Sequence, residues 1–254
     1  MSKLGNLSDA ALAAHLAHEA GRIALRVRAE SGLEGRGLGD EGDRRANEYL
    51  VAALREARPD DGILSEESKD TEARLSKSRV WIVDPVDGTR EYGEGRSDWA
   101  VHVALSVDGA PTIGAVALPG LAGGTVLRSD EVRPLEPYDA APRFLVSRSR
   151  PAKEAVAVAE AMGGDLIPMG SAGAKAMAVV RGEAEIYLHS GGQYEWDNCA
   201  PAAVALAHGL HASRIDGAPL TYNHRETWLP DLLICRPELA GQVLKLVSDL
   251  PVSE

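Results

Sequence analysis

The chain has 254 residues, 44% of them hydrophobic, so it can bury a substantial core as one large domain or two small ones. Its formal net charge of −11 opposes binding to nucleic-acid polymers, which requires a basic face. No apolar run is long enough to span a bilayer, and Cys199 and Cys235 form neither a disulfide framework nor a metal-binding spacing, so we expect a cytoplasmic protein without nucleic-acid or membrane partners.

The N-terminal segment predicts two helices separated by a loop. Ser8 and Asp9 form a good helix N-cap, after which apolar residues recur at helical spacing. Residues 31–42 are rich in glycine and charge and predict a mobile loop. A second amphipathic helix is expected to begin at Asp43 and to end before Pro59. An aspartate at this position can cap its helix through the helix dipole, which is the simplest interpretation of Asp43.

A short strand at Ile63 and Leu64 precedes two adjacent acidic residues, Glu66 and Glu67. Because neighbouring residues on a strand point to opposite faces, only one of the two can enter a site directly. The following residues, 69–78, are strongly charged and predict an exposed loop.

The most informative stretch covers residues 80–92. Its apolar run is too short for a helix and rich in β-branched residues, which predicts a buried strand that Pro85 should halt. Asp84 and Asp87 would then lie beside the outward-facing N–H groups of the turn at 88–89. Such a combination suits divalent cations together with a phosphate. The alternative is an ordinary turn, since Asp-Pro and Asp-Gly are each common in turns.

Strands and tight turns follow and predict an antiparallel sheet. Alternating apolar residues over 99–105 indicate a half-buried strand, and a turn leads into a hairpin partner at 112–118 and a further strand at 125–127. Prolines 134, 137 and 142 suggest a boundary between two domains. The first, 1–141, is an α+β domain with most of the acidic candidates, and the second, 142–254, is an α/β domain that adds Asp197.

The second half alternates between strand and helix signals, which is typical of an α/β layer. Strands are expected at 144–146, 184–188, 211–215 and 232–235. Helices are expected to begin at Pro151, Gly170-Ser171, Asp197 and Pro237. Taken alone, Asp197 is expected to be the cap of its helix.

The run Asp84-Pro85-Val86-Asp87-Gly88-Thr89 resembles the signature of the inositol monophosphatase superfamily of metal-dependent, lithium-sensitive phosphatases. The segments Ser65–Ser68 and Glu195–Asp197 resemble two further motifs of that family in the right order, and the likeness covers nearly the whole chain. The resemblance implies an α/β fold with an α+β N-terminal half, layered as an αβαβα sandwich.

The resemblance also implies roles for individual residues. Two or three Mg²⁺ ions would be held by Glu67, Asp84, the Val86 carbonyl, Asp87 and Asp197. Thr89, made more basic by a carboxylate, would position the attacking water, and Glu67 and Asp43 would be catalytic as well. Asp43 would then both cap its helix and point into the metal site.

Residues 90–92 and 147–150 resemble segments of the 3′(2′),5′-bisphosphate nucleotidases within this superfamily. The implied reaction removes the 3′-phosphate of adenosine 3′,5′-bisphosphate to give AMP, in sulfur assimilation. Arg148 and Arg150 could meet the second phosphate, although an ordinary exposed turn is an alternative. The residues expected to contact the substrate are Gly88, Thr89, Arg90, Arg148, Ser171 and Lys175.

Two other functions remain open from the sequence. One is a broader phosphatase acting on inositol 1-phosphate or fructose 1,6-bisphosphate, and the other is a metal- or nucleotide-binding regulator without catalysis. The four carboxylates and Thr89 argue against the regulator. The family likeness also suggests a homodimer. Residues 37–43 depart from the relatives, because a Lys and a Thr-x-x-Asp segment common there are absent.

Overall fold

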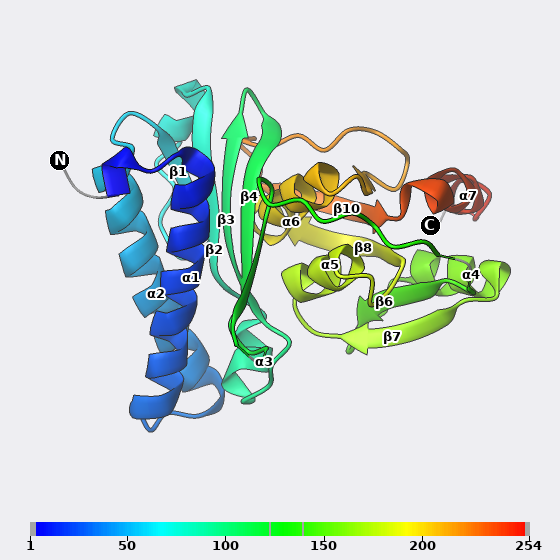
Figure 1. Ribbon diagram of the computed structural model, residues 1–254, viewed down its shortest axis with the longest axis horizontal. Coiled ribbons are helices and arrows are strands. Elements are labelled where there is room, and N and C mark those ends of the chain that lie inside the picture. The colour runs from blue at the N-terminus through cyan, green and yellow to red at the C-terminus, as the bar shows by residue number, and fades with distance from the viewer. Residues whose placement is uncertain (1–3, 122, 139, 252–254) are drawn as a thin grey trace.

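The computed structural model describes residues 4–121, 123–138 and 140–251, and these form five stacked layers (Figure 1). Helices α1 and α2 cover one face of a first sheet, α5 and α6 lie between the two sheets, and α4 and α7 cover the far face of the second sheet. This arrangement confirms the predicted αβαβα sandwich. The α-helices are α1 (Asp9–Glu30), α2 (Gly35–Ala57), α3 (Thr89–Gly93), α4 (Lys153–Met162), α5 (Ala172–Val180), α6 (Glu195–Ala207) and α7 (Pro237–Ser248).

The first sheet has the strand order β1-β2-β3-β4-β5. β1 pairs with β2 in parallel and the other neighbours are antiparallel, so the antiparallel prediction holds except for β1. The prediction that the strand after Trp99 is half-buried is wrong, because α1 packs on one face of β3 and α6 on the other. The strands are β1 (Gly62–Ser65), β2 (Arg79–Asp87), β3 (Ala100–Val107), β4 (Ala110–Leu118) and β5 (Thr125–Arg128).

Residues 31–34 form the expected loop, but helix α2 begins at Gly35, so the loop predicted over 35–42 is wrong and Asp43 lies inside the helix rather than at its start. Packing explains the glycines that suggested a loop. A Cβ on Gly39 would lie 2.7 Å from the Thr89 side chain, and a Cβ on Gly42 would lie 2.5 Å from the Tyr92 ring. Each glycine costs about 1 kcal/mol of helix propensity relative to alanine, and close contact between α2 and α3 offsets that cost.

Pro85 does not end its strand, which corrects a second expectation. β2 continues to Asp87, and its pairing with β3 is irregular between Asp84 and Asp87. A bulge tolerates proline because the ladder is already interrupted there. In a regular strand, residues three apart point to opposite faces of the sheet. The irregularity is therefore what allows both carboxylates to face the same space.

Residues 69–78 are more structured than the predicted exposed loop. They include the 3-10 helix η2 (Ala73–Ser76) and the buried Arg74. Its guanidinium donates to Asp70 at 2.7 Å, to the Asn223 side chain at 2.8 Å and to the His224 carbonyl at 2.9 Å. These bonds attach the segment to the chain that follows β9.

The second sheet has the order β7-β6-β8-β10-β9, with β7, β6 and β8 parallel and β10 antiparallel to both neighbours. The predicted alternation of strands and helices is confirmed, although β8 continues well beyond its expected end at 188. One hydrophobic cluster joins residues on both sides of the predicted 141/142 boundary, including Ile82, Leu145 and Met177. The strands are β6 (Arg143–Ser147), β7 (Asp165–Met169), β8 (Ile186–Tyr194), β9 (His211–Ser213) and β10 (Trp228–Cys235).

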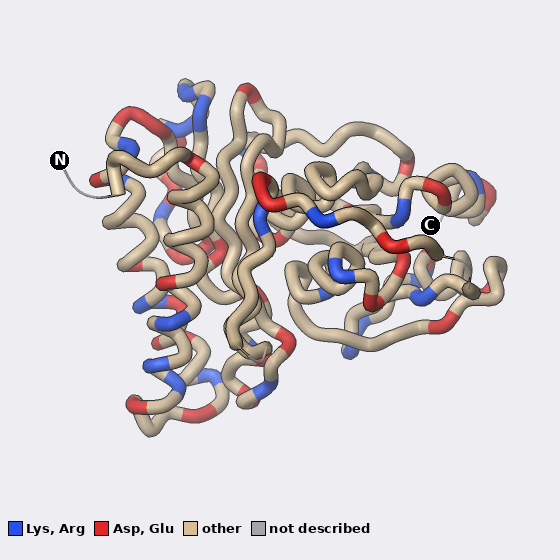
Figure 2. Tube along the Cα trace, in the orientation of Figure 1, with Lys and Arg blue, Asp and Glu red and all other residues tan. Residues whose placement is uncertain are grey.

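Acidic and basic residues are interspersed along the outer helices α1 and α2, which is typical of a solvated face (Figure 2). Within the described ranges, no helix combines the length and the apolar character needed to cross a membrane.

Candidate active site

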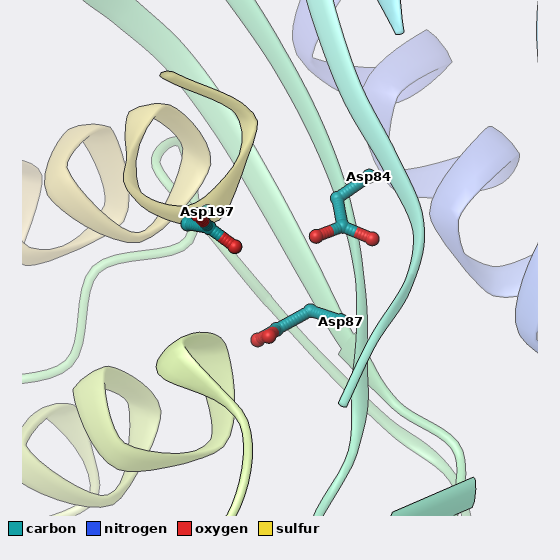
Figure 3. Close-up of side chains that lie close together, drawn as sticks. All are labelled: Asp84, Asp87 and Asp197. Carbon is teal, nitrogen blue, oxygen red and sulfur yellow. The ribbon is translucent and has the colours of Figure 1, made fainter. Parts of the chain in front are cut away.

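Three carboxylates from distant parts of the chain meet between the first sheet and α6. One oxygen of each of Asp84, Asp87 and Asp197 lies within 4.8 Å of the others. Figure 3 shows Asp84 and Asp87 extending from β2 toward the first turn of α6, which carries Asp197. The structure therefore brings together three of the residues that the sequence predicted as metal ligands.

Asp84 is the least compensated member of this acidic cluster. It is 1% exposed, and its Oδ1 is buried without a hydrogen-bond partner in the described chain. Burial and, after it, the charge of Glu66 raise the pKa of Asp84 well above its ordinary value. A buried anion in this setting needs a cation or a proton.

Asp87 is stabilised as an anion by the N-terminus of α5. Its carboxylate accepts the Ser171 hydroxyl at 2.5 Å and the N–H groups of Ala172 and Gly173 at 3.1 and 2.6 Å. Burial alone would raise the pKa of Asp87, but the His102 ring and these hydrogen bonds outweigh it and lower the pKa to about 2. Asp87 is thus ionised throughout the neutral range.

His102 is a site residue that the sequence analysis missed. It is fully buried on β3, with Nε2 in an ion-pair contact 3.2 Å from Asp87 and Nδ1 2.9 Å from the Trp196 carbonyl. Burial would lower the pKa of His102, but the Asp87 charge outweighs it and raises that pKa. A Cβ on Gly173 would lie 2.0 Å from Nε2, so glycine is required there. A histidine in a largely apolar strand was the signal for this residue in the sequence.

Asp197 is the third residue of α6, not its cap, because the helix begins at Glu195. Its carboxylate accepts the Tyr194 N–H at 2.6 Å, which is the carboxylate half of a capping box. Burial and the Asp87 charge raise the pKa of Asp197 to about 6. The helix N-terminus therefore orients Asp197 but only partly compensates its charge.

The motif indicates Glu67 as the metal ligand, but in the structure the neighbouring Glu66 interacts with Asp84. Both follow β1 in a turn and both are exposed as whole residues. The Glu66 carboxylate is close enough to Asp84 for a hydrogen bond, and burial of that carboxylate, with the charges of Asp197 and Glu67, raises the pKa of Glu66 to about 7. Glu66 is therefore a neighbour of the acidic cluster, in addition to the predicted ligand Glu67.

Thr89 and Asp43 form a pair beside the cluster. Thr89 Oγ1 lies 2.8 Å from Asp43 Oδ2 and 3.0 Å from the Val86 carbonyl, and it can donate its proton to either oxygen. Burial, opposed by the Thr89 hydrogen bond, raises the pKa of Asp43 to about 8. Asp43 Oδ1 has no partner in the described chain. The predicted contact between Thr89 and a carboxylate is thus present.

Two adjoining cavities lie next to the acidic cluster. The first, here called the Arg150 cavity, has a volume of about 540 Å³ and is lined by Arg90, Glu91, Ser147, Arg148, Ser149, Arg150, Gly170, Ser171 and Lys175. The second, called the Asp197 cavity, has a volume of about 390 Å³ and includes Asp87, Asp197, Gly88, Tyr194 and Trp228 in its lining. They share Ser147, Arg150, Ser171 and Lys175. A larger hollow of about 620 Å³ lies between α1 and α2, but none of the clustered carboxylates lines it.

The three arginines that line the Arg150 cavity differ in whether their side chains already form ion pairs within the protein. Arg90 is paired with Glu94 at 2.8 Å, and Arg148 is paired with Glu91 at 2.6 Å and with Glu94 at 3.3 Å. The guanidinium of Arg150 has no ion pair with any residue in the described ranges and is exposed. Arg150 is therefore the arginine of the Arg150 cavity that can bind an anionic ligand without first breaking an ion pair seen in the described chain.

Ser171 and Lys175 hold the turn before α5. Ser171 adopts a left-handed φ of 53°, which is strained for a residue other than glycine. The Lys175 ammonium, buried beneath this turn, donates to the Ser171 carbonyl at 2.6 Å, and burial lowers its pKa. The Ser171 hydroxyl, which was expected to contact the substrate, thus donates to Asp87. Gly88, with φ of 87°, turns β2 into α3 without such strain.

These residues fit a site for hard divalent cations. Carboxylates and a backbone carbonyl are the ligands that Mg²⁺ takes in proteins, and two buried carboxylate oxygens, Asp43 Oδ1 and Asp84 Oδ1, lack a partner among the described residues. A cation at this position would also remove the repulsion that raises the pKa of Asp84.

The chain belongs to the inositol monophosphatase family, whose model matches residues 8–251. It is 47% identical to the 3′-phosphoadenosine 5′-phosphate phosphatase of Mycobacterium leprae over 96% of this chain and 95% of that protein. The protein of the same name from Mycobacterium bovis is 49% identical over 91% of this chain and 90% of its own length. The crystal structure of CysQ from Bacteroides thetaiotaomicron matches with a TM-score of 0.73 and 26% identity, covering 89% of this chain and 96% of that chain. The family predicted from three motifs is confirmed.

We expect Asp43→Asn to change the pH dependence of stability in metal-free protein. The pKa of Asp43 is about 8 when folded and near 3.8 when unfolded, so the folded state holds a proton that the unfolded state has lost. This contribution to stability falls as pH rises toward 8. Between about pH 6.5 and about pH 9, the wild type should lose about 2 kcal/mol relative to the variant. Urea unfolding with a chelator measures this difference, and equal pH slopes would contradict it.

Matched amide substitutions separate the two glutamates. Glu66→Gln should reduce the rise in Tm caused by Mg²⁺ more than Glu67→Gln does, because the Glu66 carboxylate interacts directly with Asp84. Thermal unfolding over a series of Mg²⁺ concentrations gives the comparison. A larger effect of Glu67→Gln would instead support Glu67, the residue that the motif indicates, as the metal ligand.

Proposed function

We propose that this chain is a Mg²⁺-dependent phosphatase that hydrolyses the 3′-phosphate of adenosine 3′,5′-bisphosphate to AMP and phosphate, in sulfur assimilation. The observation that carries the proposal is a buried acidic cluster in which Asp84 lacks a counter-charge and which adjoins a cavity with an unpaired arginine. The names of the relatives at 47% and 49% identity support the same substrate. The proposal includes a cytoplasmic location. It also includes a homodimer, which a molar-mass measurement by light scattering would test.

The cations would be two or three Mg²⁺ ions held by Asp84, Asp87, Asp197, the Val86 carbonyl and the Glu66–Glu67 turn. When bound, they would supply the positive charge that offsets the phosphate and the leaving oxygen. The protein contributes the geometry. Asp87 is fixed by α5 and Asp197 by α6, while Asp84 lies between them on β2.

Thr89 and Asp43 would direct the attacking water. Oγ1 of Thr89 donates to Asp43 or to the Val86 carbonyl, which leaves a lone pair to accept a hydrogen bond from water. When Asp43 is ionised, a proton lost by the water can pass through the hydroxyl to this carboxylate. Asp43 is buried, so the proton is held away from bulk solvent.

The Arg150 cavity would hold the phosphate that does not react. This second phosphate needs a cation of its own, and Arg150 is exposed and unpaired within the described chain. Arg148 also lines the cavity, but Glu91 and Glu94 already occupy its guanidinium. We therefore assign the direct contact to Arg150 and place Arg148 as its neighbour on the cavity wall.

We expect Asp84→Asn to release phosphate from adenosine 3′,5′-bisphosphate at below about 1% of the wild-type rate, because the central anion of the site is lost. The metal-free variant should unfold at a Tm no lower than that of the wild type, since an amide avoids the free-energy cost of burying or protonating this carboxyl. Phosphate release and thermal unfolding with a chelator are the measurements. Near-normal turnover in a folded variant would disprove the metal-site assignment.

We expect Arg150→Ala to lower kcat/KM for adenosine 3′,5′-bisphosphate by about tenfold or more, the size of a charge-assisted contact. The loss for inositol 1-phosphate, which has no second phosphate, should be much smaller. Arg150→Lys is the matched control and should recover part of the rate. Equal losses on both substrates would show that Arg150 supports the shared site instead.

A further inference from the structure

Two exposed aromatic side chains lie on the wall of the Asp197 cavity. Trp228 is 47% exposed and Tyr194 is 45% exposed, and they are the only aromatic members among the large exposed hydrophobic residues of the described chain. Both line the cavity that contains Asp87 and Asp197. They are also opposite each other in the pairing of β10 with β8, so they emerge from the same face of the sheet.

The strand geometry fixes these two rings. The pairing of β8 with β10 is irregular between Leu229 and Asp231, opposite Gly191 and Gly192. Gly192 has φ of 96°, and a Cβ there would lie 2.5 Å from the Trp228 indole nitrogen. The indole therefore lies against bare backbone. A bulge of this kind re-aims the side chains beyond it, here the pair Tyr194 and Trp228.

The Tyr194 ring is held in a similar way and lies next to the acidic cluster. It stacks on Trp196, with ring centroids 4.8 Å apart and planes at 8°. The N–H of Tyr194 donates to the Asp197 carboxylate at 2.6 Å. A group bound against the exposed part of this ring would thus lie beside a substrate whose phosphate is at the acidic cluster.

We propose that Tyr194 and Trp228 form a stacking site for the purine base of the nucleotide, an inference that rests on the proposed function. Exposed aromatic surface that is held in a fixed orientation favours a flat π-system, and base stacking on aromatic rings adds substantial affinity. The position is continuous with the acidic cluster and with Arg150, through the shared cavity lining. The ligand class is therefore a nucleotide whose phosphates, sugar and base occupy adjoining parts of one cavity.

The test compares two ligands that differ only in the base, AMP and ribose 5-phosphate, by calorimetric titration of the Mg²⁺-loaded protein. Trp228→Ala and Tyr194→Ala should each weaken AMP binding about tenfold or more, and ribose 5-phosphate binding far less. Trp228→Phe should retain most of the affinity for AMP. Leu206→Ala, an exposed apolar residue at the other end of α6, is the matched control and should change neither affinity.

An equal loss for both ligands would overturn the proposal, because the rings would then support the fold of the cavity. Unchanged AMP binding would overturn it as well, including the case in which Trp228→Ala breaks a dimer and so reveals an interface between copies. Failure of the proposed function gives a different result. The wild type would then release no phosphate from adenosine 3′,5′-bisphosphate, whether or not AMP binds through the two rings.

Discussion

Repulsion among the carboxylates around Asp84 is the interaction on which the rest of the site depends. Removing these groups from water and placing them together raises the pKa of Asp84, of Glu66 and of Asp197. In the absence of a cation, the folded protein retains protons on groups that are ionised in the unfolded chain. The metal-free fold is therefore strained at this point, and the strain is what makes binding of a divalent cation favourable.

The layered fold distributes this charge unequally. Two helices of the middle layer, α5 and α6, begin at the acidic cluster, and each offers backbone N–H groups to one carboxylate. Asp87 additionally contacts His102, and its pKa falls to about 2, whereas Asp84 Oδ1 on β2 has no partner among the described residues and the pKa of Asp84 rises. Asp87 thus stays ionised at neutral pH, whereas the charge of Asp84 depends on whether a cation is bound. The same motif supplies both behaviours because the helices reach only one of the two aspartates.

Much of the fold and of the acidic cluster could be predicted from short sequence signals. The predictions that were wrong share one cause, which is dependence on contacts between distant parts of the chain. Caps, turns and strand alternation act over a few residues, so Ser8 and the hairpin after Val107 were informative. The glycines of α2 misled because their role is contact with α3, which is distant in sequence. Pro85 misled because a bulge depends on the partner strand. His102 gave almost no signal, since its importance arises only where β3 meets the starts of α5 and α6.

The buried ammonium of Lys175 gives this enzyme site a built-in reporter of local motion. Its nitrogen donates to the Ser171 carbonyl beneath the turn that holds Asp87, and the residue is 5% exposed. Because so little of the side chain is exposed, an amine-directed reagent should react with it much faster when the start of α5 opens. The labelling rate at Lys175, compared with that of an exposed amine such as Lys245, therefore measures how often the support of Asp87 is released. A cation bound at the acidic cluster would stabilise the start of α5 and so slow the labelling of Lys175 without contacting the lysine itself.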